Sequence, residues 1–301
     1  MKSFPPQKIR NVALVGHGGA GKTTLAEALL FGAGAIARQG RVEDGNTTTD
    51  FDPEEVKRRI TLSVALAPVV YDGHKLNILD CPGYADFLPE VEAALSVADL
   101  VVFVVSAVDG VEVQTEVVWR MAAARGLARM IFVNKLDRER ASFETTLKQL
   151  QDTFGAGIAP LELPIGEEQS FRGVADLLTD RAITYDTGSP VTGDIPPDME
   201  ALEHKVREDL VEGIVVGDDA LMERYLDGDM PSPKELEDTL AKGIAAGQVF
   251  PVVCGSAVTS VGVDRLAQLI CEIGPSPMEG RPVTVEVPGG TQDVACDPAG
   301  P

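Results

Sequence analysis

Residues 16–24 read GHGGAGKTT, and this stretch decides the fold. It contains the spacing Gly-x4-Gly-Lys-Thr, which is typical of a phosphate-binding loop between a strand and a helix. The apolar run 11–15 before it predicts a buried parallel strand, and residues 24–30 after it follow a helical pattern. Glycines let consecutive N–H groups point at phosphates, and the helix adds its positive end. A chance glycine-rich turn, the alternative, would not need this strand and helix.

The loop side chains have separate expected roles. Lys22 is expected to reach the β- and γ-phosphates, and Thr23 to hold Mg²⁺ through its hydroxyl. The other loop residues that we place at the nucleotide are Gly16, His17, Gly18, Gly19, Ala20, Gly21 and Thr24.

A second motif, Asn134-Lys135-Leu136-Asp137, follows the apolar run 128–133. Ligands of open parallel sheets bind beyond the carboxyl ends of the strands, where this motif is expected. A carboxylate at Asp137 accepts hydrogen bonds from the N1–H and the exocyclic amine of guanine. Adenine lacks that donor pair, so an ATP-dependent kinase or transporter would leave Asp137 unpaired. The sequence therefore predicts a GTP or GDP site, with Asn134, Lys135 and Asp137 at the base.

Residues 80–83, Asp-Cys-Pro-Gly, follow a predicted strand hairpin with the turn Asp72-Gly73. Asp80 fits the carboxylate that supports Mg²⁺ in phosphate-loop NTPases. Gly83 is expected to offer its N–H to the γ-phosphate. The alternative is an ordinary surface turn. The residues between them, Cys81 and Pro82, are also placed at the nucleotide.

Two further segments complete the predicted site. The polar stretch 44–61 lacks periodicity and suits a switch loop that the γ-phosphate and Mg²⁺ order. Thr61 is the expected Mg²⁺ ligand in this segment, although the threonines at 47–49 are competing candidates for that role. The alternative interpretation of the segment is an ordinary mobile loop. Near the end, CGSA at 254–257 follows another apolar run. The N–H groups of Ser256 and Ala257 are expected at the guanine O6.

The alternation of buried strands and helices predicts an α/β, phosphate-loop NTPase fold with a mainly parallel central sheet flanked by helices. Asp137 and Ser256 are 119 residues apart, whereas one strand–helix–strand step needs about 30 or more. The excess predicts an inserted α+β subdomain. The expected division is residues 1–157 for the first part of the GTP-binding domain, 158–250 for the insert, 251–278 for the last strand and helix, and 279–301 for a linker and the start of a following domain.

In order and spacing, these motifs resemble the guanine-nucleotide domain of bacterial elongation factor G, over about residues 8–280. Residues 163–178 and 218–231 are similar to the subdomain that this family carries inside its nucleotide domain. Residues 293–301 look like the opening of the family's second domain, which implies that the chain is a fragment. The motifs that carry the resemblance are GHGGAGKTT (16–24), RRIT (58–61), DCPGYADF (80–87), NKLDRE (134–139) and CGSA (254–257).

Three departures from the family motifs are notable. Tyr84 replaces the histidine that is thought to orient the attacking water in translational GTPases, Arg59 replaces a glycine, and Gly18-Gly19 removes a carboxylate near the phosphates. Tyr84 suggests a divergent elongation factor G-like paralogue whose Mg²⁺-dependent GTP hydrolysis is slow or depends on the ribosome. Lys22, Gly83 and Tyr84 are the catalytic candidates. The alternative is a non-hydrolysing GTP-binding regulatory module at the ribosome.

Composition constrains the partners. With 26 Lys and Arg against 47 Asp and Glu in 301 residues, the net charge is −21, which disfavours nucleic-acid binding by this chain alone. Residues 194–240 hold 15 of the acids and four bases. They form either a solvated helical face or a docking surface, for which the resemblance implies the ribosomal stalk protein. With no apolar run of about 18 residues and no signal pattern, we expect a cytoplasmic monomer that reaches the ribosome through the full-length protein.

Overall fold

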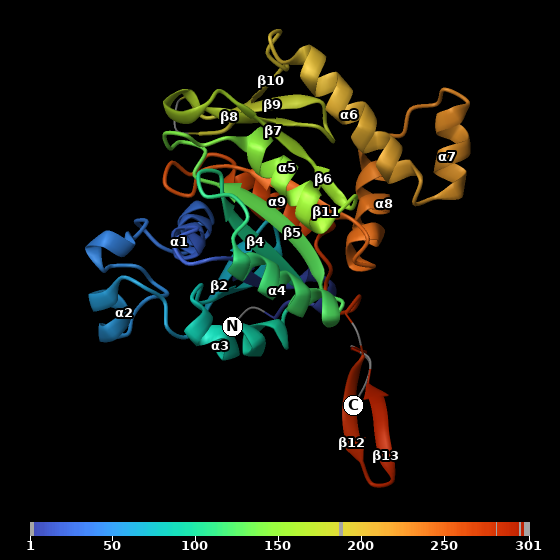
Figure 1. Cartoon of the computed structure of the whole chain (residues 1–301). Coiled ribbons are helices and arrows are strands. Elements are labelled where there is room, and N and C mark those ends of the chain that lie inside the picture. Colours follow the sequence, from blue (N-terminus) through green and yellow to red (C-terminus); the bar gives the residue numbers. More distant parts are fainter. Residues whose placement is uncertain (1–2, 187–188, 281, 295, 298–301) are drawn as a thin grey trace.

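The computed structural model describes residues 3–186, 189–280, 282–294 and 296–297. A seven-stranded sheet forms its centre, and every neighbouring pair of strands is parallel except β2 with β3 (Figure 1). This confirms the predicted mainly parallel sheet. In sheet order the strands are β2 (Ala65–Tyr71), β3 (His74–Asp80), β1 (Ile9–Val15), β4 (Leu100–Ser106), β5 (Ala128–Asn134), β11 (Phe250–Cys254) and β6 (Ile158–Pro160).

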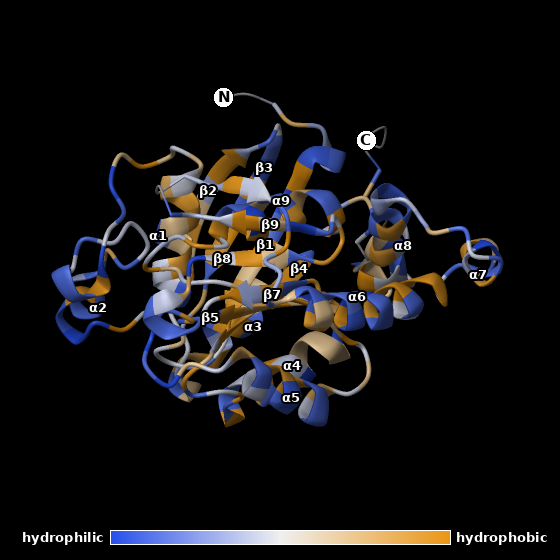
Figure 2. Ribbon diagram, turned by 90° about the horizontal axis from the view of Figure 1, so that it is seen from above, coloured by the Kyte–Doolittle hydropathy of each residue, from blue (hydrophilic) through white to orange (hydrophobic). Residues whose placement is uncertain are grey.

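Helices cover both faces of this sheet. On one face α1 and α9 pack against each other and against β2, while α3 and α4 pack on the opposite face beside β1 and β4 (Figure 2). The strands beneath are therefore enclosed on both sides, as their continuous apolar sequences require. The helices are α1 (Lys22–Gly32), α3 (Leu88–Leu95), α4 (Val113–Ala124), α5 (Phe143–Phe154) and α9 (Val263–Ile273).

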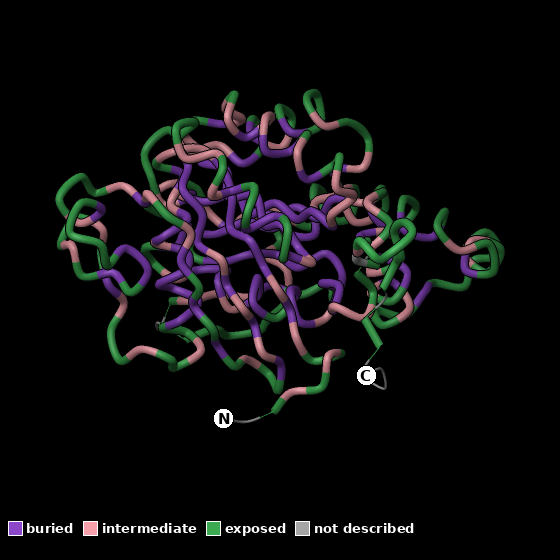
Figure 3. Tube along the Cα trace, turned by 90° about the horizontal axis from the view of Figure 1, so that it is seen from below, coloured by how far each residue is buried: buried purple, intermediate pink, exposed green. Residues whose placement is uncertain are grey.

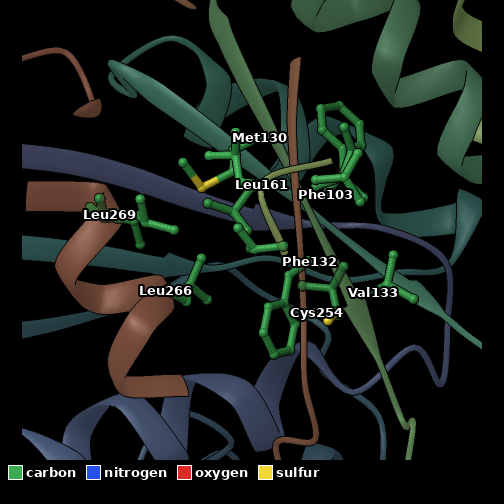
Figure 4. Close-up of a cluster of buried hydrophobic side chains, with 14 of the residues drawn as sticks. Phe103, Met130, Phe132, Val133, Leu161, Cys254, Leu266 and Leu269 are labelled. Atoms are coloured by element: carbon green, nitrogen blue, oxygen red, sulfur yellow. The ribbon is translucent and has the colours of Figure 1, made fainter. Parts of the chain in front are cut away.

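Burial follows from each strand's place in the sheet. All residues of β4 and β5 are buried, whereas β2 alternates between buried and exposed residues because α1 and α9 cover only one of its faces (Figure 3). Pro68 lies on this edge, where its missing N–H removes no inner ladder bond. The core continues between sheet and helix, where Phe132 of β5 lies near Leu266 of α9 (Figure 4).

The insert is an α+β unit with an antiparallel sheet of order β10-β9-β8-β7. β6 lies within the range 158–250 expected for the insert, yet it pairs with β11 in the central sheet. The central sheet thus extends three residues beyond the expected boundary. The elements of the insert are β7 (Glu162–Ile165), β8 (Gly173–Asp176), β9 (Arg181–Thr184), β10 (Val191–Gly193), α6 (Glu200–Val215), α7 (Asp219–Leu226) and α8 (Pro233–Ala245).

Buried ionisable side chains join the insert to the central sheet. Arg265 of α9 lies 2.7 Å from Asp176 of β8 and 2.9 Å from Glu272. Glu162 of β7 accepts a hydrogen bond from Cys254 N at 2.9 Å, and burial raises the pKa of this carboxyl to about 8. The insert therefore fixes the end of β11, directly before the segment predicted to face guanine.

The segment 44–61 differs from the irregular loop that we expected. It contains α2 (Pro53–Arg58), whose first turn is closed by a capping box between Asp52 and Glu55. Glu55 is buried and accepts hydrogen bonds from the N–H groups of Leu62 and Ser63. Part of the switch segment therefore has a defined structure of its own.

The remaining elements are short. The hairpin β12–β13 projects from the body of the molecule at its C-terminal end (Figure 1), and residues 295 and 298–301 of the expected following domain lie outside the described residues. Within the described ranges, no helix is long and apolar enough to cross a membrane. The remaining short elements are η1 (Pro6–Lys8), η2 (Val42–Asp44), η3 (Ala85–Phe87), η4 (Glu168–Ser170), β12 (Val283–Val287) and β13 (Gly290–Val294).

Candidate nucleotide-binding site

The phosphate loop joins β1 to α1 and is closed by its own lysine. Lys22 Nζ donates hydrogen bonds to the carbonyl oxygens of Gly16 (3.0 Å) and His17 (2.9 Å). Burial lowers the pKa of this ammonium to about 8. Phosphate oxygens would replace the two carbonyls as acceptors, which is the role that the sequence predicts for Lys22.

Asn134 at the end of β5 ties three distant segments together. Its Nδ2 donates to the carbonyl oxygen of Ala20 (2.9 Å) in the phosphate loop, and its Oδ1 accepts from the N–H of Ala257 (2.9 Å). A Cβ on Gly21 would lie 2.4 Å from that Nδ2, so the loop must have glycine here. The base-reading motif and the phosphate loop are thus one connected structure.

A cavity of about 650 Å³ runs from the phosphate loop to the second motif. Asp137 lies in it with its side chain 18% exposed, and its Oδ1 is buried without a hydrogen-bond partner among the described residues. Lys135 lies beside it with φ at 68° and its Nζ 3.5 Å from Asp109. An unpaired buried carboxylate oxygen fits a donor on the ligand, such as guanine N1–H. The predicted residues that line the cavity are Gly19, Gly21, Thr24, Asn134, Lys135 and Asp137.

The opposite end of the site holds hydroxyls and carboxylates suited to Mg²⁺. Thr23 Oγ1 lies 3.0 Å from Thr61 Oγ1, so the structure places the two predicted ligands together. Asp80 accepts a hydrogen bond from Thr49 Oγ1 at 2.7 Å, and its Oδ1 is buried with no partner in the described part of the chain. Burial raises the pKa of Asp80 to about 6. A divalent cation and its waters would satisfy this carboxylate, so these residues fit the ion.

Comparison with known proteins decides the family. Residues 7–276 match the elongation factor Tu GTP-binding domain. The chain belongs to this family. It is 39% identical over 288 residues to elongation factor G of Salinibacter ruber, a match that covers 94% of this chain and 41% of that protein. A crystal structure from Thermus thermophilus is 40% identical with a TM-score of 0.86, over 92% of this chain and 42% of that chain.

The chain thus spans about two-fifths of the length of these relatives. Membership of the elongation factor Tu GTP-binding domain family confirms the predicted phosphate-loop NTPase fold, and the Salinibacter relative confirms the resemblance to elongation factor G.

One residue near the predicted Mg²⁺ ligands, Asp50, was not predicted from the sequence. Asp50 accepts a hydrogen bond from Thr61 Oγ1 at 2.8 Å, and burial raises the pKa of its carboxyl. Asp50 therefore faces the same place as Thr23 and Asp80. No motif marks it, because it reaches the site only through the path of the segment 44–61.

The structure places the guanine O6 candidates differently from expectation. The N–H of Ser256 donates to Val261 O at 2.9 Å, and that of Ala257 is engaged by Asn134. Their neighbour Val258 lines the cavity instead. Any contact of these two N–H groups with guanine would replace a bond already formed.

The other predicted residues lie beneath or beside the loop. Tyr84 is exposed at the start of η3, while Gly83 before it is buried against the phosphate loop. His17 and Gly18 are half-buried. The predicted residues that are fully buried are Gly16, Ala20, Lys22, Thr23, Thr61, Asp80, Cys81, Pro82, Gly83, Asn134, Ser256 and Ala257.

Proposed function

We propose that this chain is the nucleotide-binding part of an elongation factor G-like translation factor, and that it switches between GTP and GDP states. The observation that carries the proposal is Asp137. Asp137 lines a cavity that continues to the phosphate loop, and its Oδ1 is buried without a hydrogen-bond partner among the described residues. Leaving such a group unpaired costs about 1–3 kcal/mol or more, which a guanine donor would recover.

Each end of the site has a role in this proposal. Lys22 would hold the β- and γ-phosphates, Thr23 and Thr61 would hold Mg²⁺ through their hydroxyls, and Asp80 would support the ion with its carboxylate. When bound, Mg²⁺ neutralises charge on the β- and γ-phosphate oxygens. Asn134 keeps the phosphate loop and the base site in register, and Asp137 selects guanine.

The rate of hydrolysis depends on Tyr84. A phenol is uncharged at neutral pH and places its hydroxyl farther from the backbone than an imidazole nitrogen. Because phosphoryl transfer relies on positioned groups, we propose that hydrolysis is slow or requires the ribosome to position Tyr84. The second candidate, a non-hydrolysing GTP-binding module that regulates or competes at the ribosome, rests on the same residue.

The deciding experiment measures GTP hydrolysis by the full-length protein with and without ribosomes. The first function predicts stimulation that Lys22→Ala abolishes. If wild type and Lys22→Ala hydrolyse GTP at the same rate on ribosomes, the non-hydrolysing module is favoured. Strong activation by Tyr84→His would then show that residue 84 alone withholds hydrolysis.

The acidic insert supplies a separate proposal for the partner. In α7 and after it, Leu226 and Met230 are 73% and 56% exposed within the acidic range 194–240. A basic, partly apolar protein complements such a surface, and the resemblance implies the ribosomal stalk protein. Reversing charges at Asp219, Glu223 and Asp227 to lysine should weaken binding to isolated stalk protein. Unchanged affinity would contradict the proposal.

We also propose that the protein is a cytoplasmic monomer. Light scattering of the full-length protein measures its mass and so tests the oligomeric state.

A further inference from the structure

The ring of Tyr84 lies directly on the phosphate loop. A Cβ built on Gly18 would lie 2.9 Å from Tyr84 Cζ and 3.1 Å from Cε1 and Cε2. Carbon atoms essentially never approach this closely, so the hydroxyl-bearing end of the ring occupies the space of a side chain at position 18. Any residue larger than glycine at 18 would displace the ring.

The backbone beside Tyr84 shows which part of the loop is covered. A Cβ on Gly83 would lie 2.4 Å from Lys22 Nζ and 2.7 Å from the N atom of Gly18. Gly83 therefore lies against Lys22, the residue expected to hold the β- and γ-phosphates, and Tyr84 lies against the neighbouring Gly18. Tyr84 as a residue remains 46% exposed, so this contact with Gly18 leaves much of it accessible to solvent.

We propose that Gly18 and Tyr84 act as one unit, in which Gly18 is the positioning residue that lets the ring cover the terminal phosphate of GTP. This rests on the proposed GTP-binding function and adds a specific device to it. The ring limits the access of water to the covered phosphate, so GTP dissociates more slowly than it would from an open loop. GDP lacks that phosphate and does not reach the ring. The departures from the family motifs at 18 and 84 are thus a single structural change.

A double-mutant cycle tests this unit in the intact chain. Gly18 is absent from the residues with positive φ, so Gly18→Ala needs no unusual backbone. The cycle compares wild type, Gly18→Ala, Tyr84→Ala and the double variant. A second cycle in the Tyr84→Phe background keeps the ring and removes the hydroxyl, so it should preserve the coupling to Gly18→Ala if the ring is responsible.

The first readout needs no nucleotide. Gly18→Ala should lower the midpoint of thermal unfolding by about 2 °C in the wild-type background. It should have no effect when Tyr84→Ala has already removed the ring. Equal shifts in both backgrounds would overturn the proposed contact.

The second readout is the release of a fluorescent GTP analogue, measured by stopped flow. Gly18→Ala and Tyr84→Ala should each speed release by about three- to tenfold, in line with the strength of an aromatic contact. The double variant should release GTP no faster than Tyr84→Ala, and GDP release should change less than about twofold. Equal acceleration for GDP, or additive effects on GTP, would overturn the cover. If wild type binds no GTP, the proposed function fails, while the unfolding cycle still decides whether the two residues are coupled.

Discussion

The two ends of the candidate site are built in opposite ways. At the base end, Asn134 bonds to the backbone on both sides of the cavity, and Asp137 is left with an unpaired oxygen. At the phosphate end, most functional groups bond to one another or to the loop: Lys22 bonds to loop carbonyls and Thr61 to Asp50, and only Asp80 keeps an oxygen without a partner among the described residues. The base end is preformed for a ligand, whereas most polar groups of the phosphate end are hydrogen-bonded within the protein.

Because of this difference, the base end suits recognition of guanine, and the phosphate end suits a change between two states. At Asp137 Oδ1 the base end gains a ligand bond without breaking an internal hydrogen bond, which favours specificity. The phosphate end must exchange internal hydrogen bonds for ligand bonds, and such an exchange is nearly balanced in free energy. On the proposed function, a small difference in binding free energy between GTP and GDP would be enough to change the arrangement of the segment 44–61.

The largest expected effect tests the base end. Asp137→Ala removes two hydrogen bonds to a charged acceptor, worth about 3 kcal/mol or more together, so the Kd for GTP should rise more than about 100-fold. The Kd for GDP should rise by the same factor, because both nucleotides carry guanine. Calorimetric titration with GTP, GDP and ATP measures this. A variant that loses GTP but keeps GDP would show that the two ends are not separate.

The contribution of Glu162, behind the base end, to the free energy of unfolding should depend on pH. Because the folded-state pKa of Glu162 is raised from 4.5 to about 8, the folded chain binds more protons than the unfolded chain between those two pH values, and the free energy of unfolding falls as pH rises through that window. Glu162→Gln should remove about 3–4 kcal/mol of this fall between about pH 5 and pH 8. Urea unfolding of both proteins at several pH values measures it. Parallel pH profiles would mean that Glu162 is ionised in the folded state.

At the phosphate end, the charge on Lys22 should control affinity. With its pKa lowered to about 8, Lys22 is mostly charged below that pH and must regain a proton to bind phosphate above it. The Kd for GTP should therefore rise about tenfold between about pH 7 and pH 9. Lys22→Arg stays charged throughout and serves as the control for titration of the nucleotide itself. A flat wild-type profile would contradict the prediction.

The smallest effect concerns the switch segment. Arg59 follows α2 in the left-handed conformation, with φ at 57°. Arg59→Gly should relieve about 1 kcal/mol of strain, but glycine also gains about 0.4–1 kcal/mol of freedom in the unfolded chain. The net change in unfolding free energy should stay within about 0.5 kcal/mol. A loss above about 1 kcal/mol would show that the arginine side chain itself stabilises this end.

The sequence predicted what local pattern determines. The phosphate loop, the Asn134 motif and the turn at Asp72-Gly73 are local signals, and the structure has positive φ at both turn residues. The helix α2 was missed although Asp52-Pro53-Glu54-Glu55 is a readable start signal, because the polar composition of the segment outweighed it.

Other features were beyond a single sequence. Glu162 looks like any surface glutamate until the insert folds onto β11 and buries it. Asp50 reaches the metal end only through tertiary structure, and the engagement of the Ala257 N–H depends on a side chain 123 residues away. Local propensity carries no information about such long-range contacts.

The insert leaves the central sheet after β6 and returns at the start of β11, and these neighbouring strands are parallel. A parallel connection needs a crossover of about a dozen residues or more, usually a helix. Since α8 ends at Ala245, shortly before β11 begins at Phe250, it could serve as that crossover, and the rest of the insert is by topology a removable module. Arg265 prevents simple removal, because it is 4% exposed and loses Asp176 when β8 is cut away. Arg265 would keep only Glu272 as an ion-pair partner among the described residues, and removing one partner of a buried ion pair costs about 3–5 kcal/mol. A shortened variant that lacks β8 therefore also requires a replacement for Arg265.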